Sequence, residues 1–312
     1  MGLSDRTPPT AEEYAAYRER FCNWGRWGND DELGTLNHIT PEARRAAAAL
    51  VQTGEAVSMS RPIDTHAGPA NPYPAHHFVG AGDSGAMADY FGMFIHGFVQ
   101  THIDALCHLP VDGGGKFWNG KEFAKPPMPA EHSGTIDYWR DGIVTRGVLY
   151  DVPRFRGTDY VAPGEPVHGW ELADVAAAQG IEPRPGDAVC IRSGMDVYFE
   201  KTGTSQGMGS NAGVHASAIE FLYETEASCL TWDFQDAPQD DQGIPNPLPI
   251  RIALHVHHIL LPYMGMPIVD NADFEAVADK CAEIGRWEFQ YVCAPLVLRY
   301  GTGSPVNPLA IL

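Results

Sequence analysis

Residues 94–109 constrain this chain more than any other segment, because they place titratable side chains inside an apolar run. Their sequence, FIHGFVQTHIDALCHL, holds three histidines and one aspartate: His96, His102, Asp104 and His108. On an extended strand, residues two apart point to the same face, so His102 and Asp104 share a face with Gln100 beside them. A buried carboxylate is costly unless it is paired or binds a metal. The pair therefore predicts half of a divalent metal site, with a hydrogen-bonded structural network as the alternative.

The charge balance limits the partners that this chain can have. Lys and Arg number 21 against 40 Asp and Glu, which gives a net charge of −19. Nucleic acid and anionic membrane surfaces both require basic patches, so we expect neither as a partner and expect a small-molecule substrate.

The first twenty residues lack an apolar signal core, and no apolar run is long enough to span a bilayer. Six cysteines without a C-x-x-C pair fit a reducing compartment, so we expect a cytoplasmic protein.

The order of the expected elements indicates an α/β fold. Further strands are expected at residues 56–62, 147–152, 187–192, 229–232, 266–269 and 289–298, and helices at 11–21, 40–53, 168–179, 249–263 and 272–285. Thr40 and Asn271 are the expected caps of the second and the last of these helices. Residues 66–90 are rich in Gly, Pro, Ala and His and predict a long loop. Strands and helices alternate without a repeat period, which favours a mixed sheet with helices packed on it.

A second concentration of metal-ligand residue types lies in residues 254–271, LHVHHILLPYMGMPIVDN. If its first part is helical, His255 and His258 share a face and His257 points elsewhere. Asp270 ends a short apolar strand before a helix, where its carboxylate can reach either a site or the helix N-terminus. The residues alone leave open which of the three histidines faces the site.

The run THIDALCH, residues 101–108, resembles the signature of the metal-dependent cyclase family, which includes bacterial kynurenine formamidase and isatin hydrolase. The family pattern is His-x-Gly-Thr-His-x-Asp-x-Pro-x-His. Four residues match it, namely Thr101, His102, Asp104 and His108, and three depart from it, namely Phe98, Gln100 and Leu106. GDAVCIRSG, residues 186–194, is similar to a second family strand, and the resemblance covers about residues 55–300.

This resemblance implies a β/β/α swivelling-type architecture and a divalent metal cofactor, Zn or Mn. The implied ligands are His102, Asp104, His258 and Asp270, the last two by their spacing of twelve residues. His96 is the substitute for the missing first histidine if the strand is shifted or bulged. Because Phe98 stands at that expected ligand position, the sequence does not decide whether the site binds one metal ion or two.

The resemblance also implies a general acid or base, His108, and a homodimer or homotetramer. It divides the chain into a domain at 56–312 and an extension at 1–55 that covers the site. Substrate contacts are expected from Trp24, Trp27, Phe98, Gln100, Phe117 and Trp118.

Together these features predict a hydrolase in which metal-activated water attacks an amide, lactam or lactone carbonyl of a small cyclic or aromatic substrate. Two alternatives stay open. One is a cyclase or dehydratase on the same scaffold, and the other is a metal-dependent binding protein without catalysis. A serine hydrolase is disfavoured because the chain lacks a G-x-S-x-G elbow.

Overall fold

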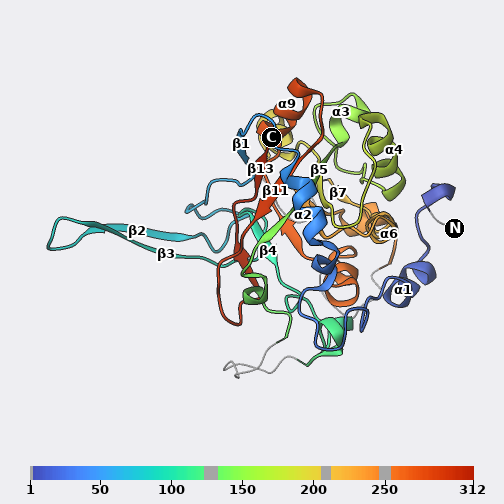
Figure 1. Cartoon of the computed structure of the whole chain (residues 1–312), viewed down its shortest axis with the longest axis horizontal. Helices are drawn as coiled ribbons and strands as arrows, with labels where there is room; N and C mark the ends of the chain where they lie inside the picture. The colour runs from blue at the N-terminus through green and yellow to red at the C-terminus, as the bar shows by residue number, and fades with distance from the viewer. Residues whose placement is uncertain (1–2, 123–132, 205–211, 246–253) are drawn as a thin grey trace.

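A large mixed sheet organises the computed structural model, which describes residues 3–122, 133–204, 212–245 and 254–312 (Figure 1). Within these residues the sheet has nine strands. In spatial order they are β1 (Ala56–Ser58), β13 (Leu309–Ile311), β11 (Glu288–Cys293), β5 (Ile143–Asp151), β6 (Ala188–Arg192), β8 (Cys229–Trp232), β10 (Ile268–Asp270), β4 (His102–Asp104) and β12 (Gly303–Pro305). The run β5–β6–β8–β10 is parallel and the flanking pairs are antiparallel. The predicted mixed α/β fold is confirmed.

Helices cover both faces of this sheet. The described α-helices are α1 (Ala11–Arg20), α2 (Pro41–Ala48), α3 (Val152–Arg156), α4 (Gly169–Gln179), α5 (Met195–Thr202), α6 (Ala218–Glu224), α7 (Gln239–Gln242), α8 (His257–Ile259) and α9 (Glu275–Ile284). Alternate residues of the central strands enter two separate hydrophobic clusters, as Val189 and Cys190 of β6 show. The first cluster includes apolar residues of α4 and α6, and the second includes residues of α2 and α9. The parallel strands are therefore apolar on both sides, as a sheet covered on both faces requires.

None of the described helices is long and apolar enough to cross a membrane.

The helix starts that the sequence predicts are confirmed where a cap is present. Thr10 accepts a hydrogen bond from the Glu13 backbone and closes a capping box at α1. Thr40 caps α2 with proline at its first position, although the helix ends at Ala48 rather than near residue 53. Local side-chain chemistry thus fixes where these helices begin more firmly than where they end.

Residues 66–90 are not one long loop, so that prediction is wrong. They contain most of an antiparallel hairpin of β2 (His76–Ala81) and β3 (Met87–Gly92). Gly, Pro, Ala and His make up most of this segment, but Gly82 and Gly85 lie in the turn between the strands, where Gly82 N donates to Ala86 O. The flanking Phe, Val and Tyr residues are good strand formers.

The predicted helix over residues 249–263 is also only partly correct. Residues 249–253 lie outside the described residues, and the rest forms the short α8 followed by a π-helical turn, Leu260–Met264. Asn271 does not cap α9, which starts at Glu275. It has a φ of +56°, and its side-chain amide instead donates to the backbone oxygens of Gly97 and Gln100.

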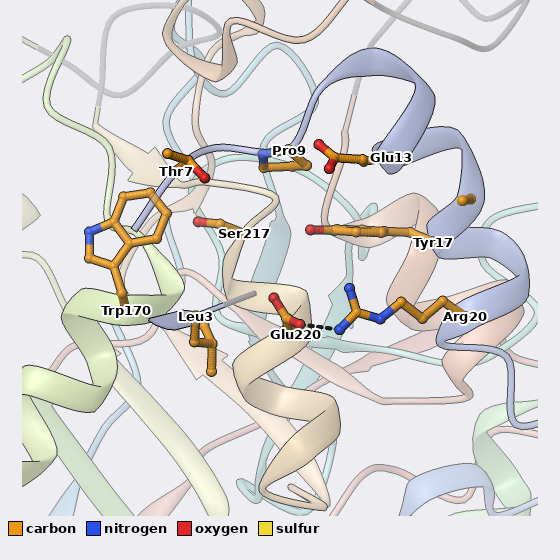
Figure 2. A pocket seen from close by; sticks show the side chains of 10 residues that line it. Leu3, Thr7, Pro9, Glu13, Tyr17, Arg20, Trp170, Ser217 and Glu220 are labelled. Atoms are coloured by element: carbon orange, nitrogen blue, oxygen red, sulfur yellow. Dashed lines mark hydrogen bonds and ion pairs between the residues drawn. The ribbon is translucent and has the colours of Figure 1, made fainter. Parts of the chain in front are cut away.

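The N-terminal residues lie against the segment that carries the second histidine cluster. The Tyr14 hydroxyl donates to His255 O, Trp24 Nε1 donates to Pro262 O, and Thr35 N donates to Gly265 O. Figure 2 shows a pocket between α1, α4 and α6, where Arg20 of α1 forms an ion pair with Glu220. The division of the chain at residue 55 stays a prediction.

Gly265 packs closely against the buried ring of Trp118. Its φ of +71° lies in the left-handed region, and a Cβ there would lie 2.5 Å from a ring carbon of Trp118. Gly285 ends α9 with a similar φ of +65°, but a Cβ there would meet no described atom within 4 Å. The two glycines therefore share a backbone requirement and differ in packing.

We expect Gly285→Ala to lower the free energy of unfolding by about 1–2 kcal/mol, the cost of a left-handed alanine. Gly265→Ala should lower it by a further ~1–3 kcal/mol, because the methyl group overpacks the Trp118 contact. Urea unfolding of both variants measures the difference. Equal losses would show that Trp118 moves aside freely.

Candidate metal centre

Three of the predicted ligands meet where β4 pairs with β10. The antiparallel register places His102 opposite Asp270, with Asp104 on the same face two residues along β4. His102 Nε2 lies 3.4 Å from Asp104 Oδ1 and 3.8 Å from Asp270 Oδ2. All three side chains are buried. The shared face predicted for His102 and Asp104 is confirmed, and the pairing of the strands brings Asp270 to it.

The backbone fixes the orientation of the His102 ring. Its Nδ1 lies 2.8 Å from the Gln100 carbonyl oxygen, which can only accept, so Nδ1 carries the proton and donates. Nε2, facing the two carboxylates, is then the nitrogen with a free lone pair. Burial acts to lower the pKa of His102, but the neighbouring Asp104 outweighs it and raises the pKa. A metal-binding imidazole held by a carbonyl at its other nitrogen is a common arrangement.

His96 also reaches the cluster, although it stands two residues before the position that the family pattern assigns to the first histidine. Its Nδ1 lies 2.7 Å from Asp104 Oδ1, and its Nε2 lies 2.9 Å from Thr302 Oγ1. Regular strand structure begins only at His102, so the alternation of faces does not extend back to this segment. Gly303 leaves room for the ring, since a Cβ there would lie 2.8 Å from His96 Cε1. Phe98 is half-buried.

His257, and not His258, is the third histidine of the cluster. His257 Nε2 lies 3.3 Å from Asp270 Oδ2 and 3.6 Å from Asp104 Oδ2. His258 was expected at the site because it lies twelve residues before Asp270, as the family resemblance implies. The structure instead brings His257, the first residue of the short helix α8, to the carboxylates. His258 is buried in the same segment.

Three further residues hold these ligands in place, and sequence reasoning missed them. Asp236 accepts hydrogen bonds from His257 Nδ1 and from the Val256 backbone. Trp232 Nε1 donates to Asp270 Oδ1, and Gln235 Nε2 donates to Asp270 Oδ2 at 3.1 Å. The sequence pattern that could have indicated them is the run WDFQD, residues 232–236, in which polar side chains directly follow the apolar β8.

His108 lies at the edge of the cluster. It sits in the turn after β4, with its Nε2 3.7 Å from Asp104 Oδ2 and its ring stacked on His96 at a centroid distance of 3.5 Å. Its side chain is 22% exposed and that of His96 is 27% exposed, whereas those of His102 and Asp104 are 1% exposed. Burial lowers the pKa of His108 to about 4, which leaves its ring neutral at pH 7. The cluster therefore opens toward solvent on the side of His96 and His108.

The residues expected to contact substrate make other contacts in the structure: the aromatic ones pack among apolar side chains, and Gln100 forms hydrogen bonds to the backbone. Trp118 is buried, its Nε1 donates to Asp31 O, and it contacts Trp27 at a centroid distance of 6.4 Å. Trp24 stacks on Tyr263, and Phe117 packs with Trp27 on the same hydrophobic cluster as Trp118. Gln100 uses its side-chain amide to hold the backbone N–H and carbonyl oxygen of Asp64. A role of these residues in substrate binding stays a prediction.

The donor set suits a divalent cation. Among the described residues, ligand atoms within 4.8 Å of one another form two groups, His96–His102–Asp104 and Asp104–His257–Asp270. Asp104 belongs to both, and a carboxylate can bridge two ions. Burial acts to lower the pKa of His257, but Asp270 and Asp236 outweigh it and raise the pKa well above its usual range. The carboxylates around His257 thus favour a positive charge at this cluster. Imidazole and carboxylate together are a donor set that Zn and Mn accept.

With this geometry in place, comparison with known proteins identifies the family. Residues 35–237 match the model of the Cyclase family, described as "Putative cyclase". The chain belongs to the Cyclase family. No curated protein matches it.

Solved structures with the same fold extend this result. A structure described as a novel cyclase is 29% identical to the chain, with a TM-score of 0.80 over 95% of this chain and 99% of the other. Isatin hydrolase A from Labrenzia aggregata, bound to benzyl benzoate, is 17% identical, with a TM-score of 0.56 over 85% and 94%. An isatin hydrolase bound to the product analogue thioisatinate is 16% identical, with a TM-score of 0.55 over 88% and 98%. The family member thus shares its fold with isatin hydrolases.

A pair of variants tests which histidine holds the metal. His257→Ala should weaken Zn or Mn binding by more than the roughly 10–100-fold that loss of a ligand's hydrogen-bond partner costs. His258→Ala, one residue along the same buried segment, should leave the affinity unchanged. Competition with a chromogenic chelator measures both. The opposite ranking of the two variants would return His258 to the site.

Proposed function

We propose that this Cyclase-family protein is a metal-dependent hydrolase of a small cyclic or aromatic amide, lactam or lactone. The observation that carries the proposal is Asp104, a buried carboxylate that belongs to two ligand groups and has a part-exposed imidazole, His108, beside it. Such a centre has buried ligands on one side and a proton acceptor on its open side. A divalent ion bound there, Zn or Mn, would polarise a carbonyl oxygen and activate water for attack.

The residues of this chain have separate tasks in that reaction. His96, His102, Asp104, His257 and Asp270 would hold one or two ions. The Gln100 carbonyl and the Asp236 carboxylate keep Nε2 of His102 and of His257 directed at the carboxylates.

His108 is suited to move the proton. Its neutral ring can accept a proton from the attacking water at an imidazole nitrogen and return it to the departing nitrogen or oxygen. The stack on His96 keeps the ring beside the ligand cluster, and its partial exposure leaves room for substrate. The acidity of the chain, with a net charge of −19, argues against a polyanionic substrate.

The isatin hydrolases that share this fold support a cyclic amide as the first substrate class to examine. A second candidate function is a cyclase or dehydratase reaction, and the 29% identical structure described as a novel cyclase favours it. The products of the two reactions differ in the origin of one oxygen atom. Hydrolysis adds an oxygen from water to its product, and cyclisation or dehydration does not.

Turnover in water enriched in oxygen-18 separates these functions. Isatin, N-formyl aromatic amines, cyclic imides and aromatic lactones form the substrate set, with the metal-loaded wild-type protein as catalyst. We expect one heavy oxygen in the new carboxylate of the product, measured by mass spectrometry. Asp104→Ala, which removes the shared ligand, is the inactive control. Product that forms without heavy oxygen would favour the cyclase or dehydratase function.

His108→Asn should lower kcat by roughly 10²–10⁴-fold, the usual contribution of general acid–base catalysis, while metal content stays near that of the wild type. The amide keeps a side chain of similar size and polarity but does not take up a proton at neutral pH. Steady-state kinetics and metal analysis of the same sample measure the two quantities. An unchanged rate, or loss of the metal, would contradict the proposed role.

A further inference from the structure

A cavity outside the metal centre lies between α1 and the helices α4 and α6. Its volume is about 120 Å³, which is enough for roughly four water molecules at ~30 Å³ each. Figure 2 shows side chains from all three helices around it, including Tyr17 of α1 and Trp170 of α4. None of the residues that line the cavity belongs to the two metal-ligand groups. The cavity is therefore a separate feature that the proposed hydrolysis does not use.

The Tyr17 hydroxyl is a polar group of this cavity that still needs a partner. Tyr17 is 4% exposed, and Figure 2 shows its hydroxyl oxygen directed into the space between the helices. No residue in the described part of the chain forms a hydrogen bond with it. Burial raises the pKa of this hydroxyl, so it stays protonated at pH 7 and can both donate and accept. Because an unpartnered buried hydroxyl costs free energy, its position favours a bound polar molecule.

The charges on the lining favour a cation. Three charged side chains reach the cavity, the carboxylates of Glu13 and Glu220 and the guanidinium of Arg20. Arg20 forms an ion pair with Glu220, which leaves one negative charge in excess. The Arg20 side chain is 46% exposed, whereas that of Glu220 is 7% exposed, so the buried charge is the carboxylate. The net charge of −19 on the whole chain adds to the attraction for cations.

The hydrogen-bonding capacity that remains in the cavity calls for donors. The ion pair with Arg20 engages Oε1 of Glu220, and no described residue donates to Oε2. Ser217 Oγ, by contrast, already accepts from Gly169 N at 3.1 Å and lies 3.1 Å from His215 Nδ1. The open positions are thus a carboxylate oxygen, which only accepts, and the Tyr17 hydroxyl. A primary ammonium group carries three N–H donors and a positive charge, and it can satisfy both.

The remaining walls suit a short carbon chain. Leu3, Pro9 and Ala16 line the cavity, and Figure 2 shows the Trp170 indole at its side. An indole face attracts a nearby cation as well as packing against apolar groups. His168 stacks on this indole at a centroid distance of 4.1 Å and supports its orientation. Burial lowers the pKa of His168 to about 3, so its ring is neutral and does not repel a cation.

From these observations we infer that the cavity binds a small aliphatic primary amine in its ammonium form. The ammonium group donates to Glu220 Oε2 and to the Tyr17 oxygen, and the carbon chain lies against the apolar wall. Tyr17 belongs to α1, whereas Trp170 and Glu220 belong to α4 and α6, so a bound amine joins the N-terminal helix to the rest of the domain. A ligand that binds only this folded arrangement stabilises it more as the ligand concentration rises.

Ligand-observed NMR on the wild-type protein, with n-propylammonium as the probe, tests this inference. We expect saturable binding with a Kd on the order of 1 mM, since a ligand of so few atoms cannot bind much more tightly, and a Tm that rises with probe concentration. Tetramethylammonium keeps the charge without N–H donors, and n-propanol keeps the chain without the charge. Both should bind about tenfold more weakly or less. Equal binding of the three probes, or no saturable binding of n-propylammonium, would overturn the inference.

The amine could also come from a protein, and a further probe separates the two sources. Nα-acetyl-lysine methylamide carries the same ammonium group on a peptide unit. It should bind more weakly than n-propylammonium, because the cavity of about 120 Å³ has no room for the peptide unit. Stronger binding of the lysine probe would count against a free amine as the ligand.

Substitutions on opposite sides of the cavity locate the bound amine. Tyr17→Phe removes only the hydroxyl, and Glu220→Gln removes the buried charge; each should raise the Kd for n-propylammonium by about tenfold or more. The matched control is Glu226→Gln, which also deprives an arginine of the N-terminal segment, Arg26, of its ion-pair partner but does not line the cavity. It should leave the Kd unchanged. Circular dichroism shows whether each variant folds, and Tyr17→Phe disturbs no ion pair. Wild-type affinity in folded Tyr17→Phe and Glu220→Gln would place the amine elsewhere and reject the site.

Discussion

The antiparallel pairing of β4 with β10 is the interaction on which the centre depends. It sets His102 directly opposite Asp270 and brings two carboxylates to one buried face. Buried carboxylates are stable only with compensating charge, and the structure supplies three imidazoles around them. The hydrogen bonds from Trp232, Gln235 and Asn271, and the ion-paired Asp236, then hold the two strands and their neighbours at this spacing. The fold around the site is therefore organised by the need to keep negative charge satisfied away from water.

Much of the fold could be predicted from patterns of residues that are close together in the sequence. The helix start at Ala11, the cap at Thr40 and the apolar runs of β6 and β8 could be predicted because each depends on residues next to it in the chain. The pair His102 and Asp104 was readable for the same reason, since two residues on one strand have a fixed relation. The hairpin was missed because Gly, Pro, Ala and His make up most of residues 66–90, and strand-forming residues are few among them.

The rest of the site depends on contacts between distant segments. The choice of His257 over His258 follows from where α8 begins, which the pattern of apolar residues did not reveal. Asp236 acquires its place only when β9 (Gln235–Asp236) lies beside the start of α8. His96 lies beside Asp104, and Gly303 on β12, some two hundred residues later, leaves room for its ring. The room for a histidine at this shifted position thus depends on a small residue in a distant segment, which the motif alone does not disclose.

Asn271 has a mechanical consequence. Its left-handed backbone turns the side-chain amide onto the carbonyl oxygens of Gly97 and Gln100, and Gln235 also donates to Gly97. Only three residues separate Gly92, the end of the β2–β3 hairpin, from His96. The hydrogen bonds to Gly97 O and Gln100 O, together with the one between Thr302 and the His96 ring, hold the backbone on the ligand side of these three residues. A displacement of the hairpin would therefore have to be taken up in residues 93–95 before it could change the distances between the ligands.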